Sequence, residues 1–129
     1  MDIFLQTPMD EKDAFMLNPQ SLAFVGDAVL SLYVRAQVLL GSTAKSGSLH
    51  KQSVTKVAAI AQSIALDKLE GFLTEREQDL IRRARNTKVN APTKKASLAD
   101  YMKSTAYEAL LGYLFVTGQK ERLKEILEK

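Results

Sequence analysis

Two acidic residues stand where the sequence is otherwise apolar, and they are the residues best placed to do chemistry. Asp27 interrupts the run from Leu22 to Leu30, and Glu108 lies in a similar run from Ala106 to Leu114. A carboxylate buried in such surroundings needs a cation, a metal or an opening to water, because leaving it unpaired is costly. The alternative for Asp27 is a solvated or cap-like role. The pattern favours a functional acid.

Carboxylate oxygens suit hard divalent cations, and Mg²⁺ typically takes one or two carboxylates and keeps several waters. Such an ion can activate a water and offset charge that develops on a phosphate. The chain has no cysteine and a single histidine, which excludes disulfides, thiol catalysis and cysteine zinc sites. The chemistry open to this acid pair is therefore that of a carboxylate metal site.

The helix that carries Asp27 is well marked. Asn18 and Pro19 suit the cap and the first turn, and Gly41 suits the end after Leu40. Helical spacing selects one apolar stripe for the core, made up of Leu22, Val25, Val29, Leu32, Ala36 and Leu40. Asp27 lies on the opposite face, which is also apolar and holds Ala23, Phe24, Leu30, Val34 and Val38. We therefore expect that second face to be buried or to meet another subunit.

Helical patterns continue along the rest of the chain, and no alternating strand pattern interrupts them. We expect one helix over about 48–70, a second from the capping box at Thr74 to about Arg85, and a third that opens at the Ser97 capping box, carries Glu108 and ends at Gly118. A short surface helix follows over 119–129. The sequence thus predicts a single all-α domain over 1–129, with an N-terminal extension at 1–14 and a basic loop at 86–96.

The charge of the chain is small but unevenly distributed. The net charge is +3, yet residues 1–27 hold five acids and one base, which leaves +7 on the remainder. This asymmetry suggests a polyanionic partner for the later part of the chain. The acidic N-terminus does not resemble a signal or transit peptide, and the apolar runs are too short to span a bilayer. We expect a protein that is located in the cytoplasm and does not bind a membrane.

Several short motifs, in this order and spacing, resemble the ribonuclease III family. Residues 22–30 read LAFVGDAVL, similar to the signature helix of that family, and residues 104–114 read STAYEALLGYL, similar to its second acidic segment. The Leu-His-Lys at 49–51, residues 81–86 (IRRARN), the opening Leu17–Pro19 and the closing 117–123 look like the Mini-III branch, which lacks a double-stranded-RNA-binding domain. The resemblance covers about residues 15–128.

The resemblance implies a Mg²⁺-dependent endoribonuclease of ribonuclease III fold that cleaves double-stranded RNA as a homodimer. It implies that Asp27 and Glu108 are both catalytic and metal-binding. It further implies maturation of large-subunit (23S) ribosomal RNA precursor ends, with a ribosomal protein or the pre-ribosome as a further partner.

The sequence departs from the larger family at two of four acidic positions. Ala23 stands where that family has Glu, and Thr105 stands where it has Asp. Mini-III enzymes are similarly reduced, which favours one metal ion with more water ligands over a two-metal mechanism. The alternative is a catalytically silent RNA-binding or ribosome-associated protein on the same fold. Retention of both Asp27 and Glu108 speaks against that alternative.

A run of bases without any acid forms a second candidate site. Between residues 82 and 95 the bases are Arg82, Arg83, Arg85, Lys88, Lys94 and Lys95, with Asn86 as a neutral donor. Such a run can meet successive RNA phosphates, and Mini-III proteins use this region as an RNA-contacting loop. The alternative is a solvated helix end favoured by the helix dipole.

Five further positions are weaker candidates. His50 and Lys51 belong to the Leu-His-Lys motif and are candidates for RNA contact, although a helix-surface histidine is the simpler reading. Tyr101, Lys103 and Ser104 precede Glu108 by one to two turns and are candidates to line its cleft. Asp100 could be mistaken for a third metal ligand, but the capping box explains it better.

Overall fold

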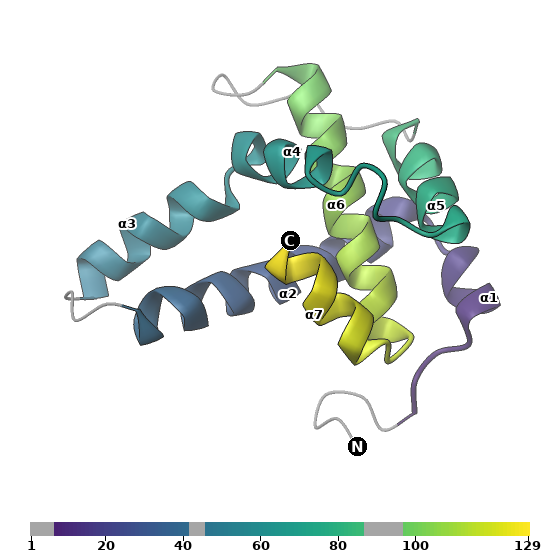
Figure 1. Cartoon of the computed structure of the whole chain (residues 1–129), viewed down its shortest axis with the longest axis horizontal. Coiled ribbons are helices and arrows are strands. Elements are labelled where there is room, and N and C mark those ends of the chain that lie inside the picture. Colours follow the sequence, from purple (N-terminus) through teal and green to yellow (C-terminus); the bar gives the residue numbers. More distant parts are fainter. Residues whose placement is uncertain (1–6, 42–45, 87–96) are drawn as a thin grey trace.

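The computed structural model describes residues 7–41, 46–86 and 97–129, and within these ranges it consists of helices joined by short connections, without a strand (Figure 1). The all-α prediction is confirmed. The helices, in chain order, are α1 (Glu11–Phe15), α2 (Pro19–Leu40), α3 (Ser46–Val57), α4 (Ala59–Asp67), α5 (Glu75–Arg85), α6 (Leu98–Val116) and α7 (Lys120–Glu128).

Helix α6 is the centre of the domain. Figure 1 shows α2 crossing it, with α4 and α5 beside its first half and α7 returning along its second half. Every residue from Ala109 to Leu114 is buried. Burial of this apolar segment on several sides helps to hold the neighbouring helices in place. Glu108 directly precedes the segment, so the core of the domain holds its backbone rigidly.

The predicted helix boundaries at α2, α5 and α6 are confirmed by their caps. The Asn18 side chain accepts a hydrogen bond from the Gln20 backbone N–H at 2.9 Å, and Thr74 forms a full capping box with Glu77. At α6 the Ser97 hydroxyl accepts from the Asp100 backbone N–H and donates to the Asp100 carboxylate. These local bonds satisfy backbone donors that helix ends otherwise leave unpaired.

The predicted inward face of α2 was wrong. Leu32, Ala36 and Leu40 of the expected core stripe are exposed, whereas Val34 and Val38, expected on the second face, are buried. Helix periodicity could not decide between the two faces because α2 is apolar nearly all round. The choice depends on the partner helix: α6 packs against the side that carries the small residues Ala23 and Gly26.

The expected helix over 48–70 is two helices. Ala58 has an extended backbone (φ −64°, ψ 152°) and separates α3 from α4. Neither glycine nor proline stands at this position, so no residue in the sequence marks the break. The expected extension at 1–14 also contains structure, because α1 begins at Glu11 and buries Ala14 against the core.

Among the described helices, α2 alone has the length and hydropathy that a membrane crossing requires. The same criteria admit the apolar core helix of a soluble domain, so they are weak evidence for a membrane span. In this fold the apolar character of α2 is used in packing against α6.

Candidate active site

Two glycines set the distance between the two helices that carry the acids. A Cβ on Gly26 would lie 1.7 Å from the backbone oxygen of Glu108, and a Cβ on Gly112 would lie 1.9 Å from that of Leu22. No side chain fits at either position, so the backbones of α2 and α6 meet there directly. Asp27 directly follows one glycine, and Glu108 lies one turn before the other. The close crossing therefore brings the two acids together.

Asp27 and Glu108 line one pocket of about 460 Å³ at this crossing. Asp27 is exposed at its edge and Glu108 is half-buried. The other described lining residues are Gln20, Ala23, Phe24, Tyr101 and Thr105. The pocket thus combines two carboxylates with an opening to water, as expected of acids that bind a ligand from solution. Ala23 and Thr105, the positions at which the larger family carries acids, both line it.

Two further polar residues extend from this pocket into the core. The Gln62 amide of α4 donates to Glu108 Oε2 at 3.5 Å, and the Ser104 hydroxyl donates to Gln62 Oε1 at 2.5 Å. Both residues are buried. Ser104 lies one turn before Glu108, so a single amide bridges two successive turns of α6. Gln62 was not among the residues predicted from the sequence, although a glutamine within the apolar α4 could have indicated it.

The electrostatics of the pocket favour an added cation. Burial raises the pKa of the Glu108 carboxyl to about 8, and the nearby Asp27 carboxylate adds to the rise by hydrogen bonding and repulsion. The Gln62 amide opposes the rise because it donates to the ionised form. A cation placed between the acids would reverse this balance, since it stabilises both carboxylates in their ionised form.

The donor set fits a hard divalent ion that keeps most of its waters. Oxygen atoms are the ligands available, and two carboxylates match the number that Mg²⁺ typically takes. Within the described part of the chain, no group of three or more Asp, Glu, His or Cys side chains that could hold a metal ion gathers, at this pocket or at any other place. The pair of Asp27 and Glu108 can therefore hold such an ion only if water fills the remaining positions.

The weaker candidates around Glu108 separate into different environments. Tyr101 lines the acidic pocket. Lys103 instead forms an ion pair with Asp67 at 2.6 Å and lines a different hollow, between α4 and α5. Ser104 contacts Gln62 rather than the pocket. Asp100 is hydrogen-bonded to Ser63 and Ser97, which lowers its pKa, as a capping role requires.

The basic residues at the end of α5 have unequal surroundings. Arg82 pairs with Asp79 at 2.5 Å and is exposed, whereas Arg83 donates to the Leu17 backbone oxygen at 2.6 Å. The Arg83 guanidinium also lies 4.8 Å from the centre of the Phe15 ring. Arg83 therefore has a structural role, holding the segment between α1 and α2 against α5.

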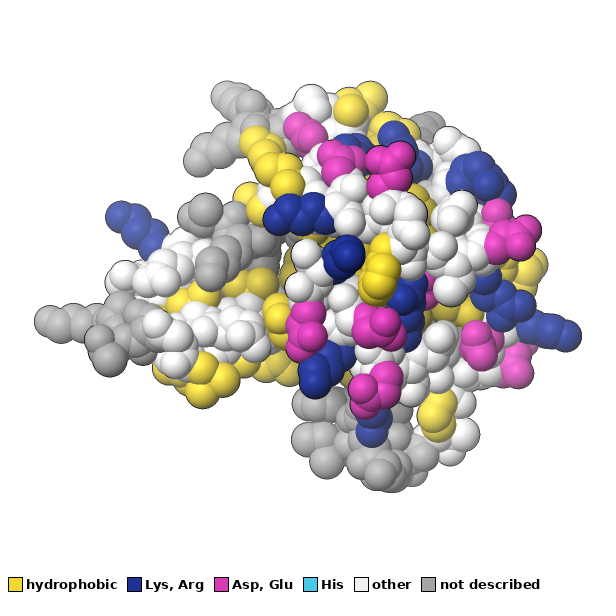
Figure 2. Space-filling model, viewed as in Figure 1, with side chains coloured by type: hydrophobic (Ala, Val, Ile, Leu, Met, Phe, Trp, Pro, Cys, Tyr) yellow, Lys and Arg dark blue, Asp and Glu magenta, His cyan; other side chains and the backbone are white. Residues whose placement is uncertain are grey.

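The remaining predicted RNA contacts lie at the surface or beyond the described ranges. Arg85 and Asn86 are exposed at the end of α5, and His50 and Lys51 are exposed on α3. Lys88, Lys94 and Lys95 fall in residues 87–96, outside the described residues. On the face shown in Figure 2, basic and acidic side chains are interspersed.

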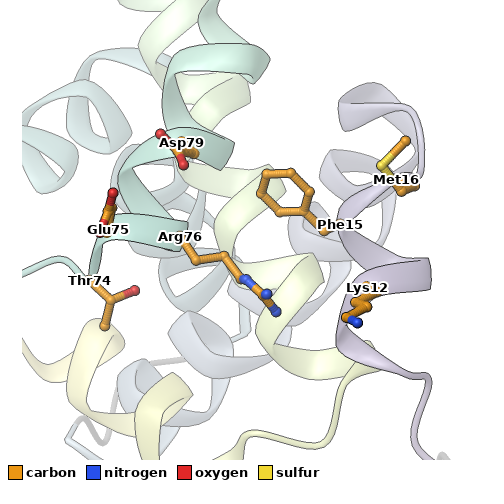
Figure 3. A pocket seen from close by; sticks show the side chains of 7 residues that line it. All are labelled: Lys12, Phe15, Met16, Thr74, Glu75, Arg76 and Asp79. Atoms are coloured by element: carbon orange, nitrogen blue, oxygen red, sulfur yellow. The ribbon is translucent and has the colours of Figure 1, made fainter.

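A larger pocket, of about 790 Å³, lies between α1 and α5 (Figure 3). Figure 3 shows Phe15 of α1 and Arg76 of α5 facing its centre, with Asp79 above Arg76 on α5. Arg76 pairs with Glu11 at 3.7 Å, and Asp79 pairs with Arg82. Because opposite charges are interspersed there, this pocket lacks the concentrated negative charge of the pocket at the α2–α6 crossing.

Comparisons with known proteins support the fold. The family model described as "Ribonuclease III domain" matches residues 20–119, which include both acids. A solved structure of a protein from Fusobacterium nucleatum superposes with a TM-score of 0.80 at 29% identity, covering 86% of this chain and 90% of that chain. The chain thus contains a ribonuclease III domain.

Curated relatives specify the group more closely. The chain is 41% identical to a Mini-ribonuclease 3 of Thermoanaerobacter over 93% of this chain and 84% of the relative. It is 43% identical to that of Symbiobacterium thermophilum over 87% and 86%, and 38% identical to that of Staphylococcus aureus over 88% and 87%. The chain therefore belongs to the ribonuclease III family, in its Mini-ribonuclease 3 group, and is an endoribonuclease.

Proposed function

We propose that the chain cleaves double-stranded RNA at the pocket formed by Asp27 and Glu108, with Mg²⁺ as the cofactor. The observation that carries this proposal is the glycine crossing, which brings an exposed and a half-buried carboxylate together in one open pocket. When bound there, Mg²⁺ would supply Lewis-acid stabilisation of the phosphate and a more acidic water.

The side chains of the pocket have distinct parts in this proposal. Asp27, at the exposed edge, is placed to reach an ion that arrives with the RNA. Glu108 lies deeper, and its raised pKa means that it releases a proton when a cation binds. Phe24 is 82% exposed and also lines the pocket, beside the acids.

A duplex substrate suits the exposed bases at the end of α5. Arg82, Arg85 and Asn86 can donate hydrogen bonds to RNA phosphates. Such contacts recognise the shape of a duplex and do not depend on its base sequence. The kinship with Mini-ribonuclease 3 extends the proposal to 23S ribosomal RNA precursors in the cytoplasm, with a ribosomal protein or the pre-ribosome as a further partner.

We also propose a homodimer, with an interface different from the one first expected. Val34 and Val38 are buried within the chain and cannot contact a partner. The exposed stripe of α2 instead holds Phe24, Leu32 and Leu39, which are 82%, 59% and 60% exposed. An isologous contact through this stripe would place the two acidic pockets of a dimer about a two-fold axis. The two strands of an RNA duplex are also related by a local two-fold axis, so each pocket could act on one strand. Leu32→Glu should convert the dimer into monomers in sedimentation, and a wild-type monomer at micromolar concentration would contradict the proposal.

The decisive experiment compares cleavage of a long RNA duplex with that of its separated strands, in Mg²⁺ and in EDTA. Asp27→Asn and Glu108→Gln preserve shape and should lower the cleavage rate by several orders of magnitude. Asp67→Asn is the matched control, because it removes a carboxylate from the surface away from the pocket. Near-normal cleavage by either pocket variant would overturn the assignment.

The alternative considered from the sequence, a catalytically silent RNA-binding protein, does not fit the kinship with Mini-ribonuclease 3. That alternative predicts duplex binding without cleavage, in Mg²⁺ as in EDTA. The retained pair of acids favours the enzyme, because a silent module gains nothing from a half-buried carboxyl beside a second one.

A further inference from the structure

The buried amide of Gln62 has a place in the site that packing alone does not require. Its side chain is 3% exposed and reaches from α4 to Glu108 on α6. Burying a polar amide carries a free-energy penalty unless its groups are hydrogen-bonded, and an apolar side chain of similar size would fill the same space. The reason for a glutamine at this position therefore lies in the polar groups that its amide contacts, Glu108 and Ser104.

We propose that Gln62, oriented by Ser104, is a positioning residue that holds the Glu108 carboxylate in the geometry needed to bind the metal ion. This inference rests on the proposed function of the pocket formed by Asp27 and Glu108. It adds to that proposal a residue from a third helix, α4, which supports the acid from behind.

The chemistry of the three groups determines the direction of the hydrogen bonds. An ionised carboxylate only accepts, so the NH₂ group of Gln62 must face Glu108. The amide oxygen then faces Ser104 and requires a donor, and the Ser104 hydroxyl supplies one at 2.5 Å. With Gln62 reversed, its oxygen would face the carboxylate oxygen and repel it. Ser104 thus fixes the amide, and the amide fixes one oxygen of Glu108.

The arrangement holds Glu108 from the α4 side and leaves the side that faces Asp27 open toward the pocket. Gln62 contacts Oε2 from the α4 side, while Asp27 approaches from α2 across the open pocket. A carboxylate held at one oxygen loses rotational freedom about its terminal bond, so less freedom remains to be lost when the metal binds.

The test uses Gln62→Met, which preserves volume and removes the hydrogen bonds to Glu108 and Ser104, together with Ser104→Ala and the double variant. Ser63→Ala is the matched control, because it removes a buried hydroxyl of α4 that contacts Asp100 instead of Glu108. Mg²⁺ affinity is measured by calorimetry on RNA-free protein. Single-turnover cleavage, duplex binding in EDTA and thermal unfolding are measured beside it.

Gln62→Met should weaken Mg²⁺ binding about 10-fold or more and slow cleavage in parallel, while duplex binding in EDTA stays within about 2-fold of wild type. Ser104→Ala should weaken Mg²⁺ binding less. Its effect should disappear in the Gln62→Met background, since the hydroxyl acts only through the amide. Ser63→Ala should leave Mg²⁺ affinity unchanged.

Unchanged Mg²⁺ affinity in Ser104→Ala and Gln62→Met, with a lower unfolding temperature alone, would overturn the inference. If Gln62→Met does not fold, Ser104→Ala decides the matter by the same criterion. The Glu108→Gln variant separates the two proposals. If this variant still binds Mg²⁺ and cleaves RNA, the proposed function is wrong. If it is inactive while the Gln62 and Ser104 variants are fully active, only the positioning role of Gln62 is overturned.

Discussion

Glu108→Gln should stabilise the metal-free protein while it abolishes cleavage. The variant replaces a buried carboxyl whose pKa is raised to about 8 with a neutral amide of the same shape. The new amide can accept from Gln62 and donate to Asp27, so it keeps the contacts of the protonated acid. Stability gained at the expense of activity is the behaviour expected of a charge held in place for function.

The size of the effect follows from the pKa. A rise from the ordinary value of 4.5 to about 8 corresponds to at most about 5 kcal/mol, at roughly 1.4 kcal/mol per pH unit. Water that enters the open pocket lowers the penalty of burying the charge below this limit, so we expect a gain of between about 2 and about 5 kcal/mol. Because the folded state binds the proton more tightly, wild type has its full stability from this group below about pH 4.5 and loses it progressively up to about pH 8.

The assay is urea unfolding of wild type and variant in EDTA at several pH values between 5 and 9. The two proteins should be nearly equal in stability at the acid end, and the variant should gain steadily until about pH 8 and then level off. Added Mg²⁺ should stabilise only wild type. The reasoning is refuted if, at pH 8.5 in EDTA, the variant is no more stable than wild type.

Three other predictions follow from the packing and the surface charges. Gly26→Ala should lower the free energy of unfolding by about 3 kcal/mol or prevent folding, because its Cβ would overlap a backbone oxygen of α6; wild-type stability in denaturant melts would contradict the close crossing. Arg122→Ala should lower it by about 3 kcal/mol, since it leaves the buried Glu77 carboxylate without its partner at 2.6 Å, and a loss below about 1 kcal/mol would show the pair to be dispensable. Changing Arg82 and Arg85 to Ala should weaken duplex binding equally for unrelated sequences and flatten the slope of log K against log salt by up to about 1.8; an unchanged slope would exclude these arginines as phosphate contacts.

Local signals in the sequence were sufficient for much of the fold. Asn18, Thr74 and Ser97 each cap a helix through bonds within the following turn, so their effect could be read from nearby residues. The two acids could also be singled out, because a charge within an apolar run is conspicuous without any knowledge of its neighbours.

Features that depend on distant residues could not be read in this way. The inward face of α2 is decided by Gly112 of α6, which the periodicity of α2 does not contain. The link between Gln62 and Glu108 joins residues 46 positions apart. Arg83 looked like its basic neighbours, yet its contacts with Leu17 and Phe15 give it a structural role.

The account depends most directly on the claim that Asp27 and Glu108 together bind the metal ion. Titration calorimetry of Mg²⁺ into RNA-free protein at pH 8 tests it, with Asp27→Asn, Glu108→Gln and the surface control Asp67→Asn. We predict one ion per chain for wild type and the control, and no measurable binding for either pocket variant, while circular dichroism shows that both remain folded. Mg²⁺ binding of unchanged stoichiometry and affinity in Asp27→Asn or Glu108→Gln would contradict the claim.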